Sequence, residues 1–329
     1  MSIILGIEST AHTFGIGVVR NGKILSNVRD MYTTKSGGII PMDSAQHHIK
    51  ISSDVYSRAL SESKINEKEI DAIAFSQGPG LAPCLIEGMN FAKKLAKRLG
   101  VSLIGVNHCV AHLEIGRSLG TKDPVMLYAS GANTQVIAYE SGKFRVFGET
   151  LDIGVGNFID NFARFLGIGF PGGPRVEELA KKSKNYIELP YRVKGMDIAL
   201  SGILTNLRQK RESKKFKVED LAFSMQETVF AMLVETAERA LAHTGKKELL
   251  LAGGVACNSR LQEMCKIMCG ERGCEFFVPE RPLLVDNGAM IAYLGEIMFK
   301  KGIYFKGKSV DNVDILPRQR TDDVIVSWK

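Results

Sequence analysis

Short apolar runs broken by glycine-containing turns open the chain and predict β-strands. Longer stretches follow in which apolar residues recur at helical spacing, and these alternate with further short apolar runs. In the first third of the chain we expect strands at residues 3–7, 14–20, 23–29, 72–76 and 101–106 and helices at 43–63 and 85–99. Gly22 marks a tight turn in a three-stranded meander, and Gly100 ends the second helix.

The same order of elements recurs in the rest of the chain, starting with a second three-stranded meander. We expect strands at residues 125–129, 134–140, 143–147 and 249–252 and helices at 156–166, 175–184, 218–243, 258–268 and 288–300. The repetition lies in the architecture and not in the residues, and it predicts two α/β domains of similar plan that face each other. This is the arrangement of the actin, sugar-kinase and Hsp70 superfamily (ASKHA), in which two actin-like (RNase H-like) domains enclose a ligand cleft.

This plan also predicts where the domains divide. We expect an N-terminal domain at residues 1–124, completed by 288–329, and a C-terminal domain at 125–287 with a helical insertion at about 154–217. Both strand-turn-strand hairpins then point at the cleft, where small turn residues let backbone N–H groups approach a phosphate. The glycine-rich segment LLLAGGVACNSR is expected to lie beside a nucleoside.

Composition limits the class of protein. The 329 residues are 45% apolar and 24% charged, which is typical of a globular protein and excludes a disordered chain. No apolar run approaches the roughly 18 residues of a membrane-spanning helix, and the start MSIILGIEST lacks the pattern of a secretory signal. Six cysteines contain no C-x-x-C pair, so we expect reduced thiols in a cytoplasmic protein without a membrane partner.

Basic residues exceed acidic ones, and the net charge of +7 favours an anionic partner. Basic residues are concentrated in two clusters, at 208–217 and 93–98. Either cluster alone is also typical of a solvated helix face or loop. Two clusters on one basic chain make nucleic acid a candidate partner, and we expect the 208–217 run on a surface segment before the long helix.

Two histidines stand four residues apart in NHCVAHLEIG, a spacing that places both imidazoles on one face of a helix. His108 and His112 therefore have metal-ligand spacing, although two buried histidines bonded to carbonyl groups would show the same pattern. A zinc peptidase would need the motif H-E-x-x-H, with the glutamate as general base. Cys109 follows the first histidine instead, so a metallopeptidase is disfavoured.

Two further side chains could complete a metal site. Asp286 lies in the DNG turn before the last helix, where it could ligate a metal, cap the helix or do both. Tyr128 ends a strand just before a Ser-Gly turn, and by itself it would be a core residue. Two nitrogens and two oxygens suit iron or zinc better than magnesium. We expect one such ion per chain, with iron preferred over zinc.

The segment GFPGGPRVEELA predicts a loop that runs into a helix. Its adjacent Gly172 and Gly173 exceed what a helix start requires and indicate close approach of the backbone to a ligand. On the preceding helix, Asp160 stands four residues before Arg164, which is also typical of a surface ion pair. Glu8 follows the first strand, where nucleotide-hydrolysing members of the superfamily carry a magnesium-binding aspartate, and this disfavours a kinase.

Five motifs in the same order resemble the universal family of tRNA threonylcarbamoyladenosine-synthesis proteins. They are NHCVAHLEIG, YASGANTQ, GFPGGPRVEELA, LLLAGGVACNSRLQEM and DNGAMIAYLG. The segments IESTAHTFGIGVV and ILPRQRTDDVIVSW are similar to the archaeal–eukaryotic branch, and the resemblance covers essentially the whole chain. It implies transfer of a threonylcarbamoyl group from threonylcarbamoyl-adenylate to the exocyclic amine of the adenosine 3′ of the anticodon, in tRNAs that read codons beginning with adenine.

The resemblance also implies roles for individual residues. The family's metal ligands correspond to His108, His112, Tyr128 and Asp286. Its nucleotide and acyl-adenylate contacts correspond to Tyr128, Ala129, Ser130, Gly131, Ala132, Asp160, Gly173, Glu177 and Asn258. Threonylcarbamoyl-adenylate, ATP or AMP is then the ligand in the cleft, and no catalytic residue is implied beyond the metal site.

Archaeal members of this family work in the KEOPS assembly, so the resemblance implies tRNA, a small protein kinase and other KEOPS subunits as partners. The chain departs from the family pattern at Asn161, at Ala132 and in the stretch DIALSGILTNL, which is less aromatic than usual. A nucleotide-binding regulatory subunit without catalysis is the main alternative. A degenerate copy of that kind would be expected to lose metal ligands, whereas this chain keeps all of them.

Overall fold

The computed structural model describes residues 2–34 and 38–329. Its first part contains a five-stranded sheet in the order β3-β2-β1-β4-β5. The strands are β1 (Ile3–Glu8), β2 (Thr13–Arg20), β3 (Lys23–Met31), β4 (Ala72–Gly78) and β5 (Ser102–Asn107). The first three form the predicted antiparallel meander, and β4 and β5 run parallel to β1.

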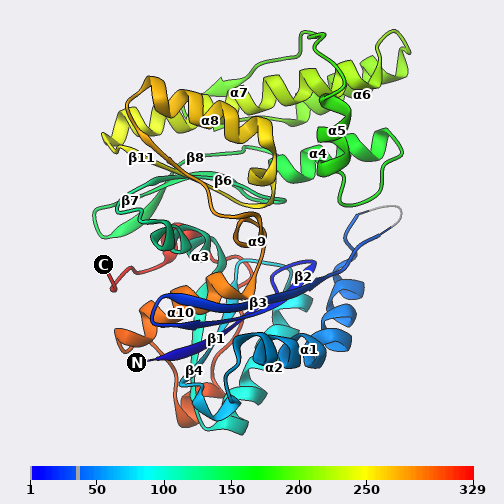
Figure 1. Cartoon of the computed structure of the whole chain (residues 1–329). Coiled ribbons are helices and arrows are strands. Elements are labelled where there is room, and N and C mark those ends of the chain that lie inside the picture. Colours follow the sequence, from blue (N-terminus) through cyan, green and yellow to red (C-terminus); the bar gives the residue numbers. More distant parts are fainter. Residues whose placement is uncertain (1, 35–37) are drawn as a thin grey trace.

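Helices cover both faces of this sheet, because alternate residues of a strand point to opposite sides. The helices are α1 (Pro41–Ser63), α2 (Ala82–Leu99) and α10 (Gly288–Lys300). Leu5 and Ile7 of β1 belong to the core beneath α1 and α2, whereas Ile4 belongs to a core that includes α10. The last helix of the chain thus returns to the first sheet (Figure 1).

A second five-stranded sheet has the order β12-β11-β6-β7-β8. Its strands are β6 (Val125–Ala129), β7 (Thr134–Glu140), β8 (Lys143–Glu149), β11 (Glu248–Ala252) and β12 (Glu275–Phe277). The helices on its outer side are α4 (Val155–Phe165), α5 (Gly173–Ala180), α6 (Ser201–Glu212), α7 (Val218–Thr244) and α8 (Ser259–Glu271). Leu127 of β6 packs with Phe158 of α4 and Phe230 of α7 in one continuous core.

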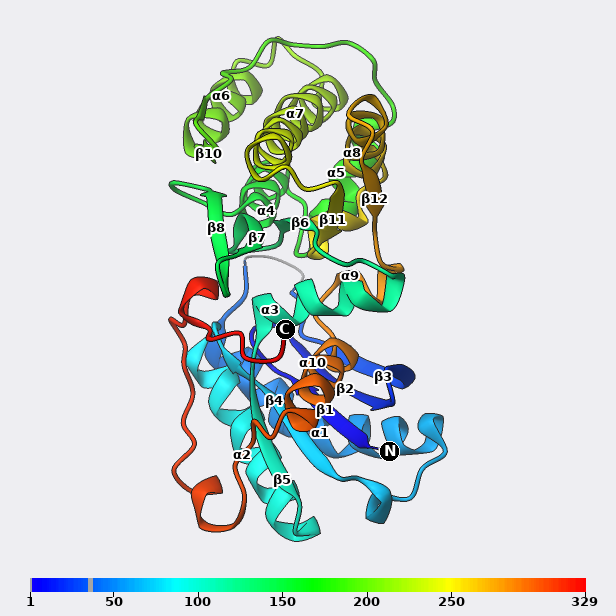
Figure 2. The same cartoon turned by 90° about the vertical axis from the view of Figure 1, so that its left-hand side faces the viewer.

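One buried layer lies between the two sheets and contains α10 and α3 (His108–Glu114) (Figures 1 and 2). Val110 of α3, Met126 and Leu250 of the second sheet, and Ile291 of α10 belong to the same core cluster. Because this layer is made of segments that are far apart in the sequence, side chains at its edge can converge from both halves of the chain.

The start of α10 lies very close to the backbone of the first sheet. A Cβ atom at Gly17 would lie 2.3 Å from the backbone nitrogen of Ala289, and one at Gly288 would lie 2.3 Å from that of Gly17. Only glycine permits such an approach. The two glycines therefore fix the position of α10 and of the turn before it, which carries Asp286.

The structure confirms the predicted strands and helices to within about one helical turn, and it adds several that were not predicted. These are α6, the short helix α9 (Arg281–Leu284), and the short strands β9 (Val193–Lys194), β10 (Asp197–Ile198) and β12. Helix α6 was missed because its sequence is rich in polar residues and only Ile203 and Leu207 are buried. The 208–217 run lies on the surface as expected, but its first half belongs to α6 and only its second half is a connecting segment before α7.

After α10 the chain passes back along the first sheet and ends in the central layer. The backbone nitrogen of Leu316 donates to the Gln77 carbonyl at 2.7 Å. Trp328 is buried, and its indole nitrogen donates to Glu114 at 3.0 Å. The C-terminal segment thus contacts both β4 and α3, and the predicted domain boundaries stay a prediction. Among the helices of the described residues, none is long and apolar enough to cross a membrane.

Candidate metal centre and ligand cleft

Helix α3 holds two imidazoles against each other in the central layer. Strand β5 ends at Asn107, whose side chain accepts a hydrogen bond from the backbone nitrogen of Val110 at 3.1 Å and so caps the helix. His108 and His112 follow on one face, with ring centroids 4.8 Å apart. Both are buried, His112 completely. The predicted helix and shared face are confirmed.

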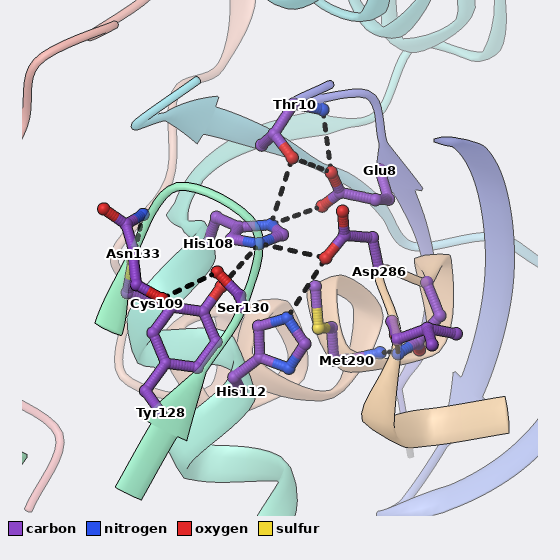
Figure 3. A network of polar contacts seen from close by, with 12 residues as sticks. Glu8, Thr10, His108, Cys109, His112, Tyr128, Ser130, Asn133, Asp286 and Met290 are labelled. Atoms are coloured by element: carbon purple, nitrogen blue, oxygen red, sulfur yellow. Dashed lines mark hydrogen bonds and ion pairs between the residues drawn. The ribbon is translucent and has the colours of Figure 1, made fainter. Parts of the chain in front are cut away.

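Asp286 reaches both histidines from the turn before α10. Its Oδ1 lies 3.3 Å from His108 Nε2 and 3.4 Å from His112 Nε2 (Figure 3). The helix cap is provided by the next residue, since the Asn287 side chain accepts from the backbone nitrogen of Met290 at 2.9 Å. The alternative that Asp286 itself caps the helix is therefore wrong, and its carboxylate faces the imidazoles.

Tyr128 joins this group from the second sheet. Its hydroxyl lies 3.2 Å from His108 Nε2, and the side chain is buried (Figure 3). Burial raises the pKa of this phenol, which therefore stays neutral. One potential ligand atom from each of His108, His112 and Asp286 lies within 4.8 Å of the others. The structure thus brings together all four residues expected around a metal.

Glu8 also belongs to this site, although it was not among the residues expected around the metal. It is completely buried at the end of β1, and its Oε2 accepts a hydrogen bond from His108 Nδ1 at 2.9 Å. Its Oε1 accepts from the backbone nitrogen of Thr10 at 2.7 Å and from the Thr10 hydroxyl. With Nδ1 engaged in this way, Nε2 of His108 is the atom that faces Asp286 and Tyr128. The sequence does show an acidic residue directly after an apolar strand, and this could have indicated a functional role for Glu8. It does not show that His108 is the partner of this carboxylate.

The electrostatics of the site favour a bound cation. Burial lowers the pKa of His108, but the carboxylates of Glu8 and Asp286 outweigh it, and the pKa lies well above its usual value. Burial raises the pKa of Asp286, but the two histidines lower it well below its usual value. Two carboxylates thus stabilise positive charge between them. Two imidazole nitrogens and one carboxylate are the protein ligands of many non-haem iron sites, so the residues fit a first-row metal ion.

The hairpin turn between β6 and β7 begins just after Tyr128 of this group. The Ser130 backbone nitrogen and hydroxyl both donate to the Asn133 carbonyl, and Gly131 and Ala132 are exposed at the tip. The carbonyls of Ser130 and Gly131 accept from the first backbone nitrogens of α4. At the base of the turn, the Ala129 carbonyl lies against Gly253, where a Cβ atom would be only 2.4 Å from it. The two glycine-containing loops therefore adjoin.

The glycine pair before α5 has two different roles. A Cβ atom at Gly172 would lie 2.3 Å from the Cβ of Ala163, so this glycine serves packing. A Cβ atom at Gly173 would meet nothing within 4 Å. Asp160 accepts a hydrogen bond from the Gly172 backbone nitrogen at 2.8 Å, and burial raises its pKa. The possible ion pair with Arg164 does not form between the described side chains.

Glu177 and Asn258 meet at the start of α8. The Glu177 carboxylate accepts from the backbone nitrogen and the hydroxyl of Ser259, at 3.2 and 2.6 Å. The Asn258 side chain caps α8 and donates to Gln226 at 2.7 Å. No hydrogen bond within residues 2–34 and 38–329 links this nucleotide group (Asp160, Gly173, Glu177 and Asn258) to the metal group (His108, His112, Tyr128 and Asp286).

Comparison with known proteins gives this geometry a context. A family model described as tRNA N6-adenosine threonylcarbamoyltransferase matches residues 23–293. A protein of that name from Thermococcus sibiricus is 54% identical over 326 residues, which are 99% of this chain and 100% of that protein. A Methanosarcina mazei protein named "Probable bifunctional tRNA threonylcarbamoyladenosine biosynthesis protein" is 51% identical, and the match covers 99% of this chain and 60% of that protein.

A solved structure supports the fold independently. The crystal structure of HypF from T. kodakarensis superimposes with a TM-score of 0.66 over 94% of this chain and 49% of that one. At 16% sequence identity this likeness shows the fold alone. Together with the two facing α/β sheets, it confirms the predicted actin-like superfamily fold.

The Glu8–His108 hydrogen bond predicts a direct effect on metal binding. Replacing Glu8 with Gln keeps the shape of the side chain but removes the charge that orients His108, and metal affinity is expected to fall about 10–100-fold. Titration of the purified variant with Fe(II) or Zn(II) against a competing chelator measures this. Glu62→Gln, at an exposed position of α1, is the matched control and should bind metal like the unmodified chain. Equal affinity in both variants would show that Glu8 serves only the fold.

Proposed function

The chain belongs to the tRNA N6-adenosine threonylcarbamoyltransferase family, and from this membership we propose how its cleft performs the reaction. Its activity is the transfer of a threonylcarbamoyl group to adenosine in tRNA. We propose threonylcarbamoyl-adenylate as the donor, and as the acceptor the exocyclic amine of the adenosine 3′ of the anticodon in tRNAs that read codons beginning with adenine. The observation that carries the proposal is the position of Asp286, whose Oδ1 lies 3.3 Å from His108 Nε2 and 3.4 Å from His112 Nε2. These residues lie beside the exposed turn at Gly131.

We propose that these three residues, with Tyr128, hold one metal ion per chain, iron in preference to zinc. The types of ligand atom support this proposal, because two imidazoles and one carboxylate on one face of a metal ion leave its other coordination positions open. Such an ion would supply Lewis acidity that stabilises negative charge on an oxygen of the reacting group. Glu8 keeps His108 Nε2 directed at that position.

The protein's own residues then position the donor and the acceptor. The donor is a mixed carbamic–phosphoric anhydride and is already activated, so the chain needs no nucleophile. The exocyclic nitrogen of adenosine bonds to the carbamoyl carbon, the bond from that carbon to the phosphate oxygen breaks, AMP leaves, and the nitrogen loses a proton. Holding both reactants in register supplies much of the acceleration. We propose that the backbone N–H groups of Gly131 and Ala132 face the anhydride and stabilise its developing charge.

The nucleotide end of the donor fits the second group of residues. We propose that Asp160, Gly173, Glu177 and Asn258 contact the nucleoside of the adenylate, or of ATP or AMP. Burial raises the pKa of Glu177, but hydrogen bonds from Ser259 and the neighbouring Lys181 outweigh it and lower the pKa overall. Glu177 is therefore an ionised acceptor that suits ribose hydroxyls.

The cleft also supports the proposed division into domains. We keep residues 1–124 with 288–329 as one domain and 125–287 as the other, with the helical insertion at 154–217 that includes α4, α5 and α6. The metal group draws its residues from both domains, and the nucleotide group lies in the second. A cleft between two such domains suits a ligand with two distinct ends.

Two other functions have less support. A kinase would need a carboxylate at the end of β1 that is free to bind magnesium, but Glu8 is engaged by His108 and Thr10. A regulatory subunit without catalysis would have no need to keep four converging donor groups, of which His108, His112 and Tyr128 are buried. Both observations favour the transferase.

The proposed partners are tRNA and, in a KEOPS-type assembly, a small protein kinase and other subunits. The Methanosarcina mazei relative is named as bifunctional and extends beyond the matched region, which supports a protein partner. Of the two basic clusters, 93–98 is mostly satisfied within the chain, since Lys97 pairs with Asp311 and Arg98 with Glu67. In the 208–217 run, Arg208 pairs with Glu212. Its other cations have no carboxylate within 4 Å among the described side chains, so we propose this run as the tRNA surface.

The transfer reaction itself is the test of the proposed function. His112→Ala removes one donor group, and the variant is expected to lose both bound metal and transfer to tRNA. Elemental analysis and a transfer assay with tRNA and threonylcarbamoyl-adenylate, with partner subunits present, measure the two. His243→Ala, at an exposed position of α7, should change neither. A variant that lost its metal but modified tRNA at the normal rate would contradict the proposed role of the site.

The space in front of Gly173 predicts a second effect. Gly173→Val places a branched side chain where a Cβ atom meets no protein atom, so the fold should persist while nucleotide affinity falls at least about tenfold, or about 1.4 kcal/mol. Calorimetric titration with AMP measures this. Gly202→Val is the matched control, because that glycine is equally open but lies in α6. Unchanged AMP affinity at Gly173 would mean that the glycine serves only the turn.

The 208–217 run predicts a salt-dependent effect on tRNA binding. Binding to phosphates releases counterions, so removing one phosphate interaction should reduce the salt slope of the binding constant by about 0.7–0.9. Replacing Lys210, Arg211, Lys214 and Lys215 with Gln should weaken tRNA binding and flatten this slope, without changing metal content or AMP affinity. Removing four charges from the 93–98 cluster is the charge-matched control and should have a smaller effect. Equal effects of the two sets would assign the binding to net charge alone.

A further inference from the structure

Two arginines, Arg29 and Arg281, lie where β3 contacts the start of α9. The Arg29 guanidinium donates to the Pro282 carbonyl at 2.8 Å, and the Asn27 side chain donates to the same carbonyl at 3.2 Å. These bonds attach β3 to the segment that begins with Arg281. Arg29 is half-buried and Arg281 is exposed. Two guanidinium groups from distant parts of the sequence thus share one region.

Neither arginine has a carboxylate partner. Within the described ranges 2–34 and 38–329, no carboxylate oxygen lies within 4 Å of either guanidinium, whereas other arginines of the chain do form ion pairs, such as Arg20 with Glu69 and Arg272 with Glu238. Burial lowers the pKa of Arg29, and repulsion from Arg281 contributes in the same direction. Arginine nevertheless stays charged. The Asp286 carboxylate attracts Arg29 without forming an ion pair with it, so the two like charges are only partly compensated, and a bound anion would lower the free-energy cost of holding them near each other.

The thiol of Cys257, which lies near both arginines, does not supply a compensating negative charge. Cys257 ends the glycine-rich loop after β11, and both guanidinium groups interact electrostatically with its side chain. Burial raises the pKa of this thiol, although both arginines oppose the shift, so it carries no negative charge. Asn258 of the nucleotide group follows Cys257 directly, and Asp286 of the metal group follows five residues after Arg281. Arg29 also interacts electrostatically with Cys257 and with Asp286, so the pair lies close to the metal group and to the loop that carries Asn258.

We propose that Arg29 and Arg281 form a phosphate-binding site that holds an RNA backbone phosphate next to the adenosine being modified. The proposal rests on the proposed function. A guanidinium binds phosphate through two parallel hydrogen bonds, and backbone phosphate contacts fix the position of a nucleic acid without reading its sequence. The exposure of Arg281 favours a large ligand that approaches from solvent. The adenylate also contains a phosphate, but we place that group at the backbone of Gly131 and Ala132.

The experiment compares tRNA and AMP binding in Arg29→Gln, Arg281→Gln and the double variant. Fluorescence anisotropy with tRNA over a range of KCl concentrations should show at least tenfold weaker binding in the double variant, or about 1.4 kcal/mol. The salt slope should fall by about one unit for each phosphate interaction that the variant can no longer make. AMP affinity and metal content should not change. Arg281→Lys keeps the charge but not the paired hydrogen bonds, and it should recover only part of the affinity.

Control variants distinguish tRNA binding at this site from a general effect of positive charge and from a loss of stability. Arg20→Gln and Arg272→Gln remove the same charge from arginines that already have carboxylate partners, and they should bind tRNA like the unmodified chain. Because Arg281 is exposed, its variant tests the site even where Arg29→Gln lowers stability. Unchanged tRNA affinity and salt slope in the double variant would overturn the proposal, and weaker AMP binding with unchanged tRNA binding would assign the pair to the adenylate instead. An unmodified chain that failed to transfer to tRNA would contradict the proposed function, which is a separate outcome.

Discussion

The partly buried carboxylate of Asp286 is the constraint on which the rest of the site depends. A charge that is taken out of water must be paired or neutralised, because desolvation of an isolated carboxylate costs several kcal/mol. Here two imidazoles approach the same oxygen, and Glu8 holds one of them from behind. The same need for compensation makes the position attractive to a metal ion. The site forms only when four elements are in place, namely β1, α3, β6 and the turn before α10.

The packing around the site provides the required rigidity. Helix α10 lies directly on the backbone of the first sheet because Gly17 and Gly288 have no side chains to separate them. Helix α3 is enclosed by residues of both sheets and of α10 in one core cluster. Ligand groups on such supports lose little freedom when an ion binds, so the affinity of the site is not reduced by reordering. The turns at Gly131 and Gly173 are more open, as a site for a larger ligand requires.

Charge is distributed in two ways over this molecule, and the difference bears on how a nucleic acid would bind. Surface lysines and arginines of the 208–217 run attract a polyanion over a distance and are sensitive to salt. The arginine pair at Arg29 and Arg281 is closer to the chemistry and partly shielded from water, where a single phosphate contact gives more positional information. Long-range attraction and local positioning are thus assigned to different parts of the surface.

The sequence by itself determined most of the strands and helices, the repeated plan of two α/β halves, and the shared helix face of His108 and His112, since all of these follow from periodicity along the chain. The tertiary structure alone decided which groups face each other across segments. Asp286 and Asn287 are both good helix caps in sequence terms, and only the packed turn shows that Asn287 caps while Asp286 faces the histidines. Glu8 meets His108 across a hundred residues, and Arg29 meets the segment after Arg281 across more than two hundred. Such partners cannot be read from local pattern, because the energy that selects them comes from burial of charge in the assembled core.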